Sequence, residues 1–190
     1  MEAPDKSALR ALVRELVRAI LPDHRRTFSE QLCAVLAEQP IWRSATSVLL
    51  FAPLADEPDI TPLLEEKSPG IIGFPRFNPK TGSYEACSIR THAELVSGRF
   101  GVLEPGAGCP VVSLNQLDLA LVPGVAFDLA GRRLGRGKGF YDRLLAEVRG
   151  HKCGVAFDAQ IVSAVPEEPH DMRVDSILTP SRWHSCRGMD

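Results

Sequence analysis

The stretch DLALVPGVAFDLAGRRLGRGKGFYDR, residues 118–143, decides the fold of this chain. It begins with an apolar run at 119–122 that suits a buried strand, and Pro123-Gly124 ends that run. Apolar residues at helical spacing follow the last glycine: Phe140, Leu144, Leu145 and Val148. The stretch therefore predicts a strand, a glycine-rich loop and a helix, with the loop opening the helix.

The predicted loop combines glycines with many cations. Gly135, Gly137 and Gly139 alternate with Arg136 and Lys138. Glycine lets backbone N–H groups approach a ligand, and a helix N-terminus carries partial positive charge, so the loop suits a phosphate. Five cations surround one acid, Asp142, and they are Arg132, Arg133, Arg136, Lys138 and Arg143. A polyphosphate would relieve the repulsion among these cations, and Asp142 could hold the accompanying magnesium ion.

The loop does not match the common phosphate-binding motifs. Walker A would need glycine where Arg132 stands and serine or threonine where Gly139 stands. For GxGxxG, the third glycine comes one residue too early. Taken alone, the loop is therefore equally compatible with a solvated basic turn.

Composition and length indicate one globular domain spanning residues 1–190, with 44% hydrophobic and 24% charged residues. A net charge of −2 gives no global reason to expect nucleic acid. Because no apolar run approaches the roughly 20 residues of a membrane span and no signal peptide is evident, we predict a cytoplasmic protein without a membrane partner. Five cysteines without a CxxC pair indicate reduced structural thiols.

Helical and strand patterns alternate along the rest of the chain. We predict a first helix between an Asp5 cap and Pro22, and a second that begins at a capping box, 27–30, and closes before Pro40. The first helix would bury one stripe of apolar residues: Leu9, Leu12, Val13, Leu16, Val17 and Ile20. Further strands are predicted at 47–51, 71–74, 84–89, 152–157 and 175–178, a short helix at 62–66, and an irregular segment at 98–115.

This alternation predicts an α/β fold: a single-domain three-layer sandwich with a mainly parallel sheet and helices on both faces. Ligands of such sheets bind at the carboxyl ends of the strands. Lys6, Arg10 and Arg14 form a cationic row on the first helix that hints at an anionic partner, although such rows are more often solvated. His170-Asp171 suits a polar turn, and Asp175 with Asp142 could form an oxygen-ligand pair for magnesium.

The motifs PGVAFD at 123–128 and GRRLGRGKGFYDR at 131–143 resemble the signature of the 5-formyltetrahydrofolate cyclo-ligase family, also called methenyltetrahydrofolate synthetases. Weaker pieces agree in the same order: KxxxR at Lys6 and Arg10, FAPLADEPD around Glu57, FGVLEP at 100–105 and HDMRVDSILT at 170–179. The resemblance implies an ATP- and Mg²⁺-dependent ligase of folate one-carbon metabolism.

The resemblance also implies residue roles. Arg136 and Lys138 would be catalytic, and Asp142 and Asp175 would be associated with the metal ion. ATP would contact Lys6, Arg10, Arg133, Leu134, Gly135, Arg136, Gly137, Lys138, Gly139, Phe140 and Tyr141. Folate would contact Ala52, Glu57, Arg136 and Phe140, although Phe140 stands where family members often carry tyrosine. Of the adjacent Phe140 and Tyr141, we expect one to pack in the core and the other to flank a ring.

The implied reaction converts 5-formyltetrahydrofolate, with or without a polyglutamate tail, to 5,10-methenyltetrahydrofolate, ADP and phosphate. ATP would phosphorylate the formyl oxygen, and N10 would then attack. No nucleic acid and no obligate protein partner is expected. The alternatives are a non-catalytic module that binds nucleotide or RNA through the basic loop, and a small-molecule kinase. The balanced charge and the lack of aromatics interleaved with the basic run argue against RNA.

Overall fold

The structure, a computed structural model, describes residues 5–66 and 70–186, and an eight-stranded sheet forms its centre. The sheet has the order β13-β12-β10-β7-β1-β2-β3-β6. Its strands are β1 (Ser47–Leu49), β2 (Ile71–Asn78), β3 (Ser83–Ser88), β6 (Val111–Val112), β7 (Leu119–Pro123), β10 (His151–Val155), β12 (Ser176–Leu178) and β13 (Trp183–Ser185). The strands from β12 to β2 pair in parallel, whereas β13, β3 and β6 pair antiparallel. The predicted mainly parallel sheet is confirmed.

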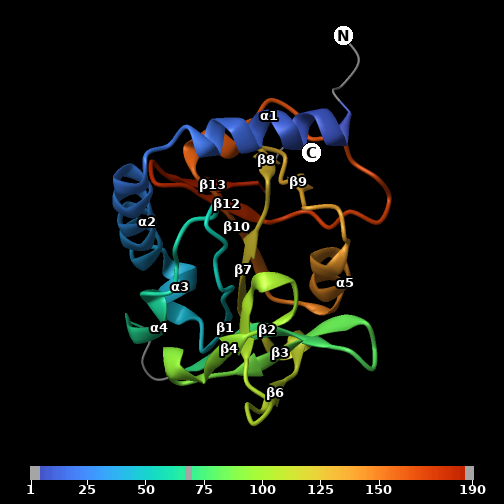
Figure 1. Cartoon of the computed structure of the whole chain (residues 1–190). Helices are drawn as coiled ribbons and strands as arrows, with labels where there is room; N and C mark the ends of the chain where they lie inside the picture. Colours follow the sequence, from blue (N-terminus) through green and yellow to red (C-terminus); the bar gives the residue numbers. More distant parts are fainter. Residues whose placement is uncertain (1–4, 67–69, 187–190) are drawn as a thin grey trace.

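Helices cover both faces of this sheet (Figure 1). One face carries α2 (Pro22–Ala37), α3 (Pro40–Ser44) and α4 (Leu63–Glu66), and the other carries α5 (Phe140–Glu147). Side chains alternate along β7, so that Leu119 and Leu121 pack toward α2 while Ala120 and Val122 pack toward α5. Because the strand is covered on both sides, its sequence is continuously apolar. The three layers expected from the sequence are confirmed.

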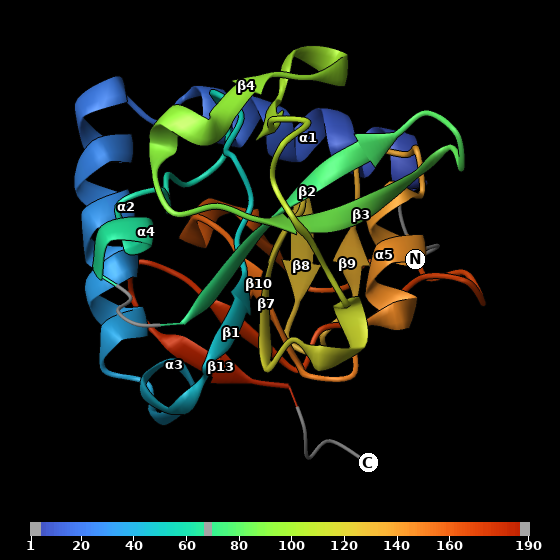
Figure 2. The ribbon, with the colours of Figure 1, turned by 90° about the horizontal axis from the view of Figure 1, so that it is seen from below.

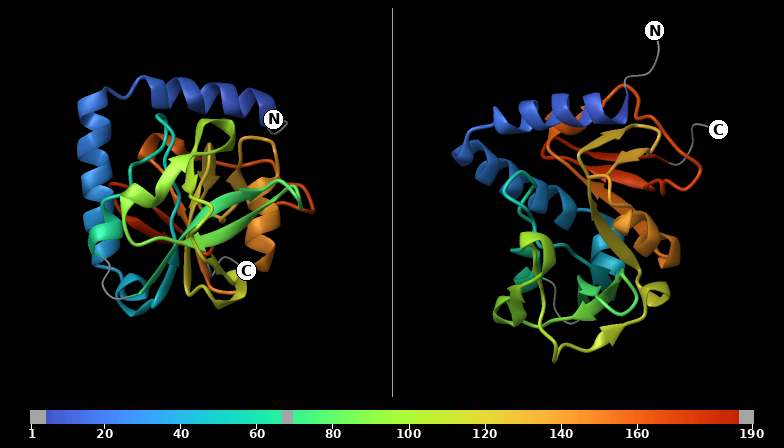
Figure 3. Two further views of the ribbon diagram at one scale, coloured as in Figure 1. Left: turned by 60° about the horizontal axis from the view of Figure 1, so that its bottom comes forward. Right: turned by 45° about the vertical axis from the view of Figure 1, so that its right-hand side comes forward.

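The first helix, α1 (Lys6–Arg18), runs across one end of the sheet, and α2 runs down one side (Figure 3, left). The α1 residues Leu9, Val13 and Val17 are buried against Ala126 and Leu134 of a small second sheet. That sheet consists of β8 (Ala126–Asp128), β9 (Arg133–Leu134) and β11 (Ile161–Val162). The β8–β9 hairpin therefore lies inside the region expected to be loop, because strands this short leave no periodic signal.

The helix boundaries differ in part from those expected. Asp5 caps α1 as predicted, since its side chain accepts a hydrogen bond from the N–H of Ser7. Pro22, however, is the first residue of α2, where its missing N–H costs nothing, so the expected capping box at 27–30 lies inside the helix. The expected apolar stripe of α1 was too wide, because Leu12 and Leu16 are 56% and 46% exposed.

The segment 98–115 is more ordered than expected. It contains β5 (Leu103–Pro105), which pairs antiparallel with β4 (Leu95–Ser97), the strand β6, and short 3₁₀ turns at Arg99–Gly101 and Leu114–Gln116. Glu104 of β5 is buried, and its carboxylate accepts hydrogen bonds from the Phe77 N–H and, at 3.4 Å, the Tyr84 hydroxyl. Figure 2 brings forward this end of the molecule, with β4 and the β2–β3 hairpin, opposite α1.

Two smaller expectations concern the thiols and the membrane. All five cysteines are free, and four of them are buried, in agreement with reduced structural thiols. Among the residues that the structure describes, no helix combines the length and hydrophobicity needed to cross a bilayer.

Asp128 is expected to be the polar group on which the β8–β9 turn depends. Its buried carboxylate accepts hydrogen bonds from the N–H groups of Ala130, Arg132 and Val165. Asp128→Ala leaves these donors without their acceptor and should lower the free energy of unfolding by about 3 kcal/mol. Urea denaturation measures the change, with the exposed acid variant Asp23→Ala as the control. An unchanged midpoint for Asp128→Ala would contradict this reading of the turn.

Candidate active site

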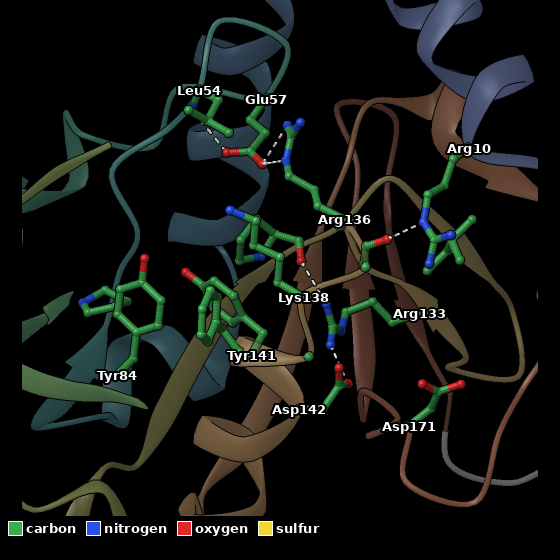
Figure 4. A pocket seen from close by; sticks show the side chains of 18 of the residues that line it. Arg10, Leu54, Glu57, Tyr84, Arg133, Arg136, Lys138, Tyr141, Asp142 and Asp171 are labelled. Carbon is green, nitrogen blue, oxygen red and sulfur yellow. Dashed lines mark hydrogen bonds and ion pairs between the residues drawn. The ribbon is translucent and has the colours of Figure 1, made fainter. Parts of the chain in front are cut away.

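A cavity of about 380 Å³ opens at the carboxyl edge of the parallel strands (Figure 4). Ala52, which follows β1, and Pro123 and Gly124, at the end of β7, line it. The other walls come from α1, from the segment around Glu57, from the β2–β3 hairpin and from the glycine-rich loop that precedes α5. This is the edge at which ligands of open α/β sheets bind.

The cavity brings together nearly all residues that the sequence singled out. The expected ATP and folate contacts line it, together with one of the two expected metal-associated acids. They are Lys6, Arg10, Ala52, Glu57, Arg133, Leu134, Gly135, Arg136, Gly137, Lys138, Gly139, Phe140, Tyr141 and Asp142.

Asp175 is the exception. It lies directly before β12, and its carboxylate accepts the N–H of Lys152, the second residue of β10, at 2.8 Å. Asp175 thus sits at the amino edge of the parallel strands, whereas the cavity lies at their carboxyl edge. The expected magnesium pair of Asp142 and Asp175 is not assembled, because an acid that precedes a strand emerges at the edge opposite to residues that follow one.

Two glycines determine the backbone conformation of the loop. Gly137 and Gly139 have φ angles of 99° and 62°, in the left-handed region that other residues rarely adopt. Gly139 is also the N-cap of α5, so the loop turns directly into the helix, and the residues 135–139 line the cavity. The prediction that the loop opens a helix is confirmed.

Acids of the protein itself neutralise much of the positive charge that a polyphosphate was expected to relieve. Arg132, Arg133 and Arg136 each form ion pairs within the protein. Their partners are Asp128 and Glu167 for Arg132, Asp142 for Arg133, and Asp56 and Glu57 for Arg136. All but Asp128 and Asp142 come from segments distant in sequence, so the spacing of residues in the loop could not predict these pairs.

Arg133 nevertheless keeps one donor that no group of the described chain accepts. Its side chain is 3% exposed, Nη2 donates to Asp142 Oδ1 at 2.6 Å, and Nη1 lies 3.5 Å from the carbonyl oxygen of Pro123. Its buried Nε has no hydrogen-bond partner among residues 5–66 and 70–186. A buried donor without an acceptor costs about 1 to 3 kcal/mol, so a ligand oxygen would fit here.

Glu57 is a buried acceptor at the other side of the cavity. Its side chain is 6% exposed, and its carboxylate accepts hydrogen bonds from the Leu54 N–H at 2.9 Å and from Arg136 Nε and Nη2 (Figure 4). Burial raises the pKa of Glu57, an effect that the Leu54 N–H and Arg136 oppose without cancelling. Burial acts in the same direction on Asp56, but the hydrogen bond and charge of Arg136 outweigh it, so the pKa of Asp56 is lowered.

The cationic row of α1 faces the cavity with its first two members. Arg10 Nε donates to the carbonyl oxygen of Gly135 at 2.8 Å and so fixes the start of the loop. Lys6 Nζ lies 2.6 Å from Asp171 and 2.9 Å from Glu168. These two acids and His170 also line the cavity, and their ligand atoms lie within 4.8 Å of one another. Sequence reasoning missed this cluster, because nothing in the spacing links it to Lys6.

An aromatic group forms the wall near β3. Phe140 meets Tyr84 and Phe77 edge-on, with ring centroids 5.3 Å and 5.7 Å away. Tyr141 packs against the core clusters on both faces of the sheet, whereas Phe140 belongs to the aromatic wall, so the expected division between a core ring and a ligand-facing ring is seen, although both residues line the cavity. Tyr84 was missed as a lining residue, since a tyrosine in a predicted strand gives no signal of a site.

Comparison with known proteins identifies the family to which this arrangement belongs. The model of the 5-formyltetrahydrofolate cyclo-ligase family matches residues 2–180. The chain belongs to this family. The curated cyclo-ligase from Escherichia coli K12 is 31% identical over 178 residues, covering 90% of this chain and 98% of that protein. The mouse cyclo-ligase is 28% identical over 187 residues, covering 91% and 92%.

A solved structure agrees with this assignment to the cyclo-ligase family. The NMR structure of 5,10-methenyltetrahydrofolate synthetase from Aquifex aeolicus superposes with a TM-score of 0.87 at 34% identity. The superposition covers 97% of this chain and 94% of that one. The chain is therefore similar to these proteins along nearly its whole length, and the resemblance inferred from the central motif is confirmed.

The two tyrosines of the chain, Tyr84 and Tyr141, provide a test of the cavity's environment. Burial, together with the nearby Glu104 carboxylate, raises the pKa of Tyr84 to about 12, and burial raises the pKa of Tyr141 well above its usual value. In the folded protein we therefore expect neither phenol to ionise near pH 10. When denaturant unfolds the protein, both phenols should titrate with the ordinary tyrosine pKa of about 10. Phenolate absorbance measures this.

The same shift predicts how stability responds to alkaline pH. The unfolded chain loses its phenolic protons first, so the free energy of unfolding should fall as pH rises from about 10 toward 12. Glu104→Gln removes the negative charge beside Tyr84 and should lower the pKa of that phenol without affecting Tyr141. One phenol ionising near pH 10 in the folded wild type would contradict the structure's account of these rings.

Proposed function

We propose that this chain catalyses the ATP-dependent cyclisation of 5-formyltetrahydrofolate to 5,10-methenyltetrahydrofolate, with release of ADP and phosphate. The proposal rests on the residues that line one cavity. A cationic glycine-rich loop and the adjacent Arg133, whose buried Nε has no acceptor within the part of the chain that the structure describes, face a buried carboxylate, Glu57, and an aromatic wall. The first half suits a triphosphate and the second suits a flat heterocycle with N–H groups.

The triphosphate would bind along the loop at 135–139. Backbone N–H groups at the start of α5 and the charges of Lys138, Arg133 and Arg10 supply donors for phosphate oxygens. Lys6 would contribute at the far side, in competition with Asp171 and Glu168, which hold its ammonium group at present. Charge-assisted hydrogen bonds of this kind contribute about 1.5 to 3 kcal/mol each.

The magnesium ion that accompanies ATP would be held by Asp142. Both hydrogen bonds that Asp142 accepts within the described chain, from Arg133 Nη2 and from the Met172 N–H, end on Oδ1. Oδ2 therefore remains for a hard cation beside the phosphate-binding loop, which fits the preference of Mg²⁺ for a carboxylate oxygen together with substrate phosphates. When bound, the ion neutralises phosphate charge. Asp175 has no part in this proposal.

The folate would occupy the opposite side of the cavity. Glu57 can accept hydrogen bonds from N–H groups of the pterin ring, and Phe140 and Tyr84 offer aromatic surface for contact with it. Ala52, three residues after the end of β1, leaves room for a ring because its side chain is small. Phe140 lacks the hydroxyl of a tyrosine, so its contribution is apolar contact only.

The reaction requires the protein mainly to position ATP and the folate and to neutralise the charge of the phosphates. The formyl oxygen attacks the γ-phosphorus and ADP departs, which turns a poor leaving group into phosphate. N10 then attacks the formyl carbon, loses its proton, and phosphate leaves as the methenyl bridge forms. Arg136 and Lys138 are the proposed catalytic donors, because both belong to the loop and line the cavity, and Arg136 also bonds to Glu57 on the proposed folate side.

Charge burial argues against the alternative of an RNA-binding module. Phosphates of a nucleic acid need accessible cations, whereas Arg133 is buried and Arg132 is held by Asp128 and Glu167. A small-molecule kinase on the same scaffold would leave a stable phosphorylated product.

The preference for polyglutamylated folate and the cytoplasmic location stay predictions.

The experiment that tests the proposal is turnover by the purified protein. With ATP, Mg²⁺ and 5-formyltetrahydrofolate, wild type should produce the absorbance of the methenyl product and ADP in equal amounts. Arg136→Ala and Lys138→Ala should each lower kcat about 10²- to 10³-fold, the loss expected when one donor to a developing charge is removed. Arg26→Ala, on the exposed surface of α2, is the matched control and should keep the wild-type rate.

Two results would contradict the proposal. The first is absence of turnover by folded protein that binds both ligands. The second is a phosphorylated folate that accumulates without ring closure, which would favour the kinase.

A further inference from the structure

The guanidinium group of Arg136 is held along one edge by two neighbouring acids. Nε and Nη2 donate to Glu57 Oε1 at 3.1 Å and 2.9 Å, and Nη2 also donates to Asp56 Oδ1 at 2.6 Å. A guanidinium is planar and carries five N–H donors. Within the described chain these bonds occupy the donors of Nε and Nη2, so the two hydrogens of Nη1 are the ones left for a ligand.

The two acids occupy different places around this group. Glu57 lines the large cavity and can itself contact a ligand, whereas Asp56 does not belong to that lining. Asp56 lies instead in a small cleft behind Arg136, together with residues of α1 and Gln160. The structure thus places Asp56 against the back of Arg136, where it touches the side chain without reaching the cavity.

The charges around Asp56 favour a stable ion pair between Asp56 and Arg136. Asp56 and Arg136 are each about one-third exposed, and the pair is anchored because Arg136 is also bonded to the buried Glu57. Arg14 of α1 adds a second favourable charge near Asp56, which offsets the excess of two acids over one guanidinium. An isolated pair of this exposure would contribute little to stability, so its effect should appear in the orientation of Arg136.

We propose that Asp56 is a positioning residue that orients Arg136 so that Nη1 points at the oxygens between which the phosphoryl group passes. This inference rests on the proposed function. A guanidinium bound only by Glu57 could pivot about that carboxylate, whereas a second acceptor on Nη2 fixes its plane. Small misplacements of a catalytic group are costly for rate, because the group must meet the reacting atoms in one geometry.

Steady-state kinetics and binding together test the proposal. Asp56→Ala should lower kcat about 10- to 100-fold while the dissociation constants of an ATP analogue and of 5-formyltetrahydrofolate change by less than about twofold. Asp56→Asn, which keeps the size but removes the charge, should show the same loss, and Asp56→Glu should restore part of the rate. Asp23→Ala, which removes an exposed acid paired with Arg26, is the matched control and should leave kcat unchanged.

The double variant Asp56→Ala/Arg136→Ala tests whether the loss of kcat in Asp56→Ala arises through Arg136. If Asp56 acts through Arg136, the double variant should be no slower than Arg136→Ala alone. The inference is overturned if folded Asp56→Ala and Asp56→Asn keep the wild-type kcat, or if the two losses multiply in the double variant. A wild type without turnover would overturn the proposed function itself and this inference with it, whereas retained activity in the Asp56 variants would overturn the inference alone.

Discussion

The compensation of the cations in and before the glycine-rich loop by acids of the protein itself, some near and some distant in sequence, is the interaction on which the site depends. Arg133 bonds to Asp142, Arg136 to Asp56 and Glu57, and Arg132 to Asp128 and Glu167. These pairs tie the glycine-rich loop to the segment after β1, β9 to α5, and the β8–β9 turn to the segment around Glu167. A loop of like charges would otherwise repel itself, and its glycines would give it little stiffness. The ion pairs therefore shape the cavity before any ligand arrives.

The same pairs assign different tasks to neighbouring arginines. Arg132 is bonded to Asp128, whose carboxylate also holds the β8–β9 turn, so this cation belongs to the scaffold. Arg133 is buried but keeps Nε without an acceptor in the described chain, and Arg136 keeps Nη1. Cations that are oriented in advance bind phosphate without first being ordered, which lowers the entropic cost of binding and of reaching the transition state.

The sequence predicted the architecture well because the decisive signals were local. The apolar run at 119–122, the glycines that follow and the helical spacing after Gly139 each depend on near neighbours, and the family motif lies in one continuous stretch. Contacts between distant segments gave no such signal. The ion pairs of Lys6 with Asp171 and of Arg136 with Asp56, the buried position of Glu57 and the role of Tyr84 in the wall all needed the fold. Asp175 was predicted to lie near Asp142, but it precedes β12 and therefore lies at the amino edge of the parallel strands, opposite the cavity.

Arginine-resolved NMR would test the central claim most directly, by following the Nε–H signals of Arg132, Arg133 and Arg136 while a non-hydrolysable ATP analogue with Mg²⁺ is added. The Nε–H proton of Arg133 should shift downfield as it gains a phosphate acceptor, Arg136 should shift as Nη1 engages the ligand, and Arg132 should stay unchanged. A saturating analogue that moves Arg132 and leaves Arg133 and Arg136 unaffected would contradict the account.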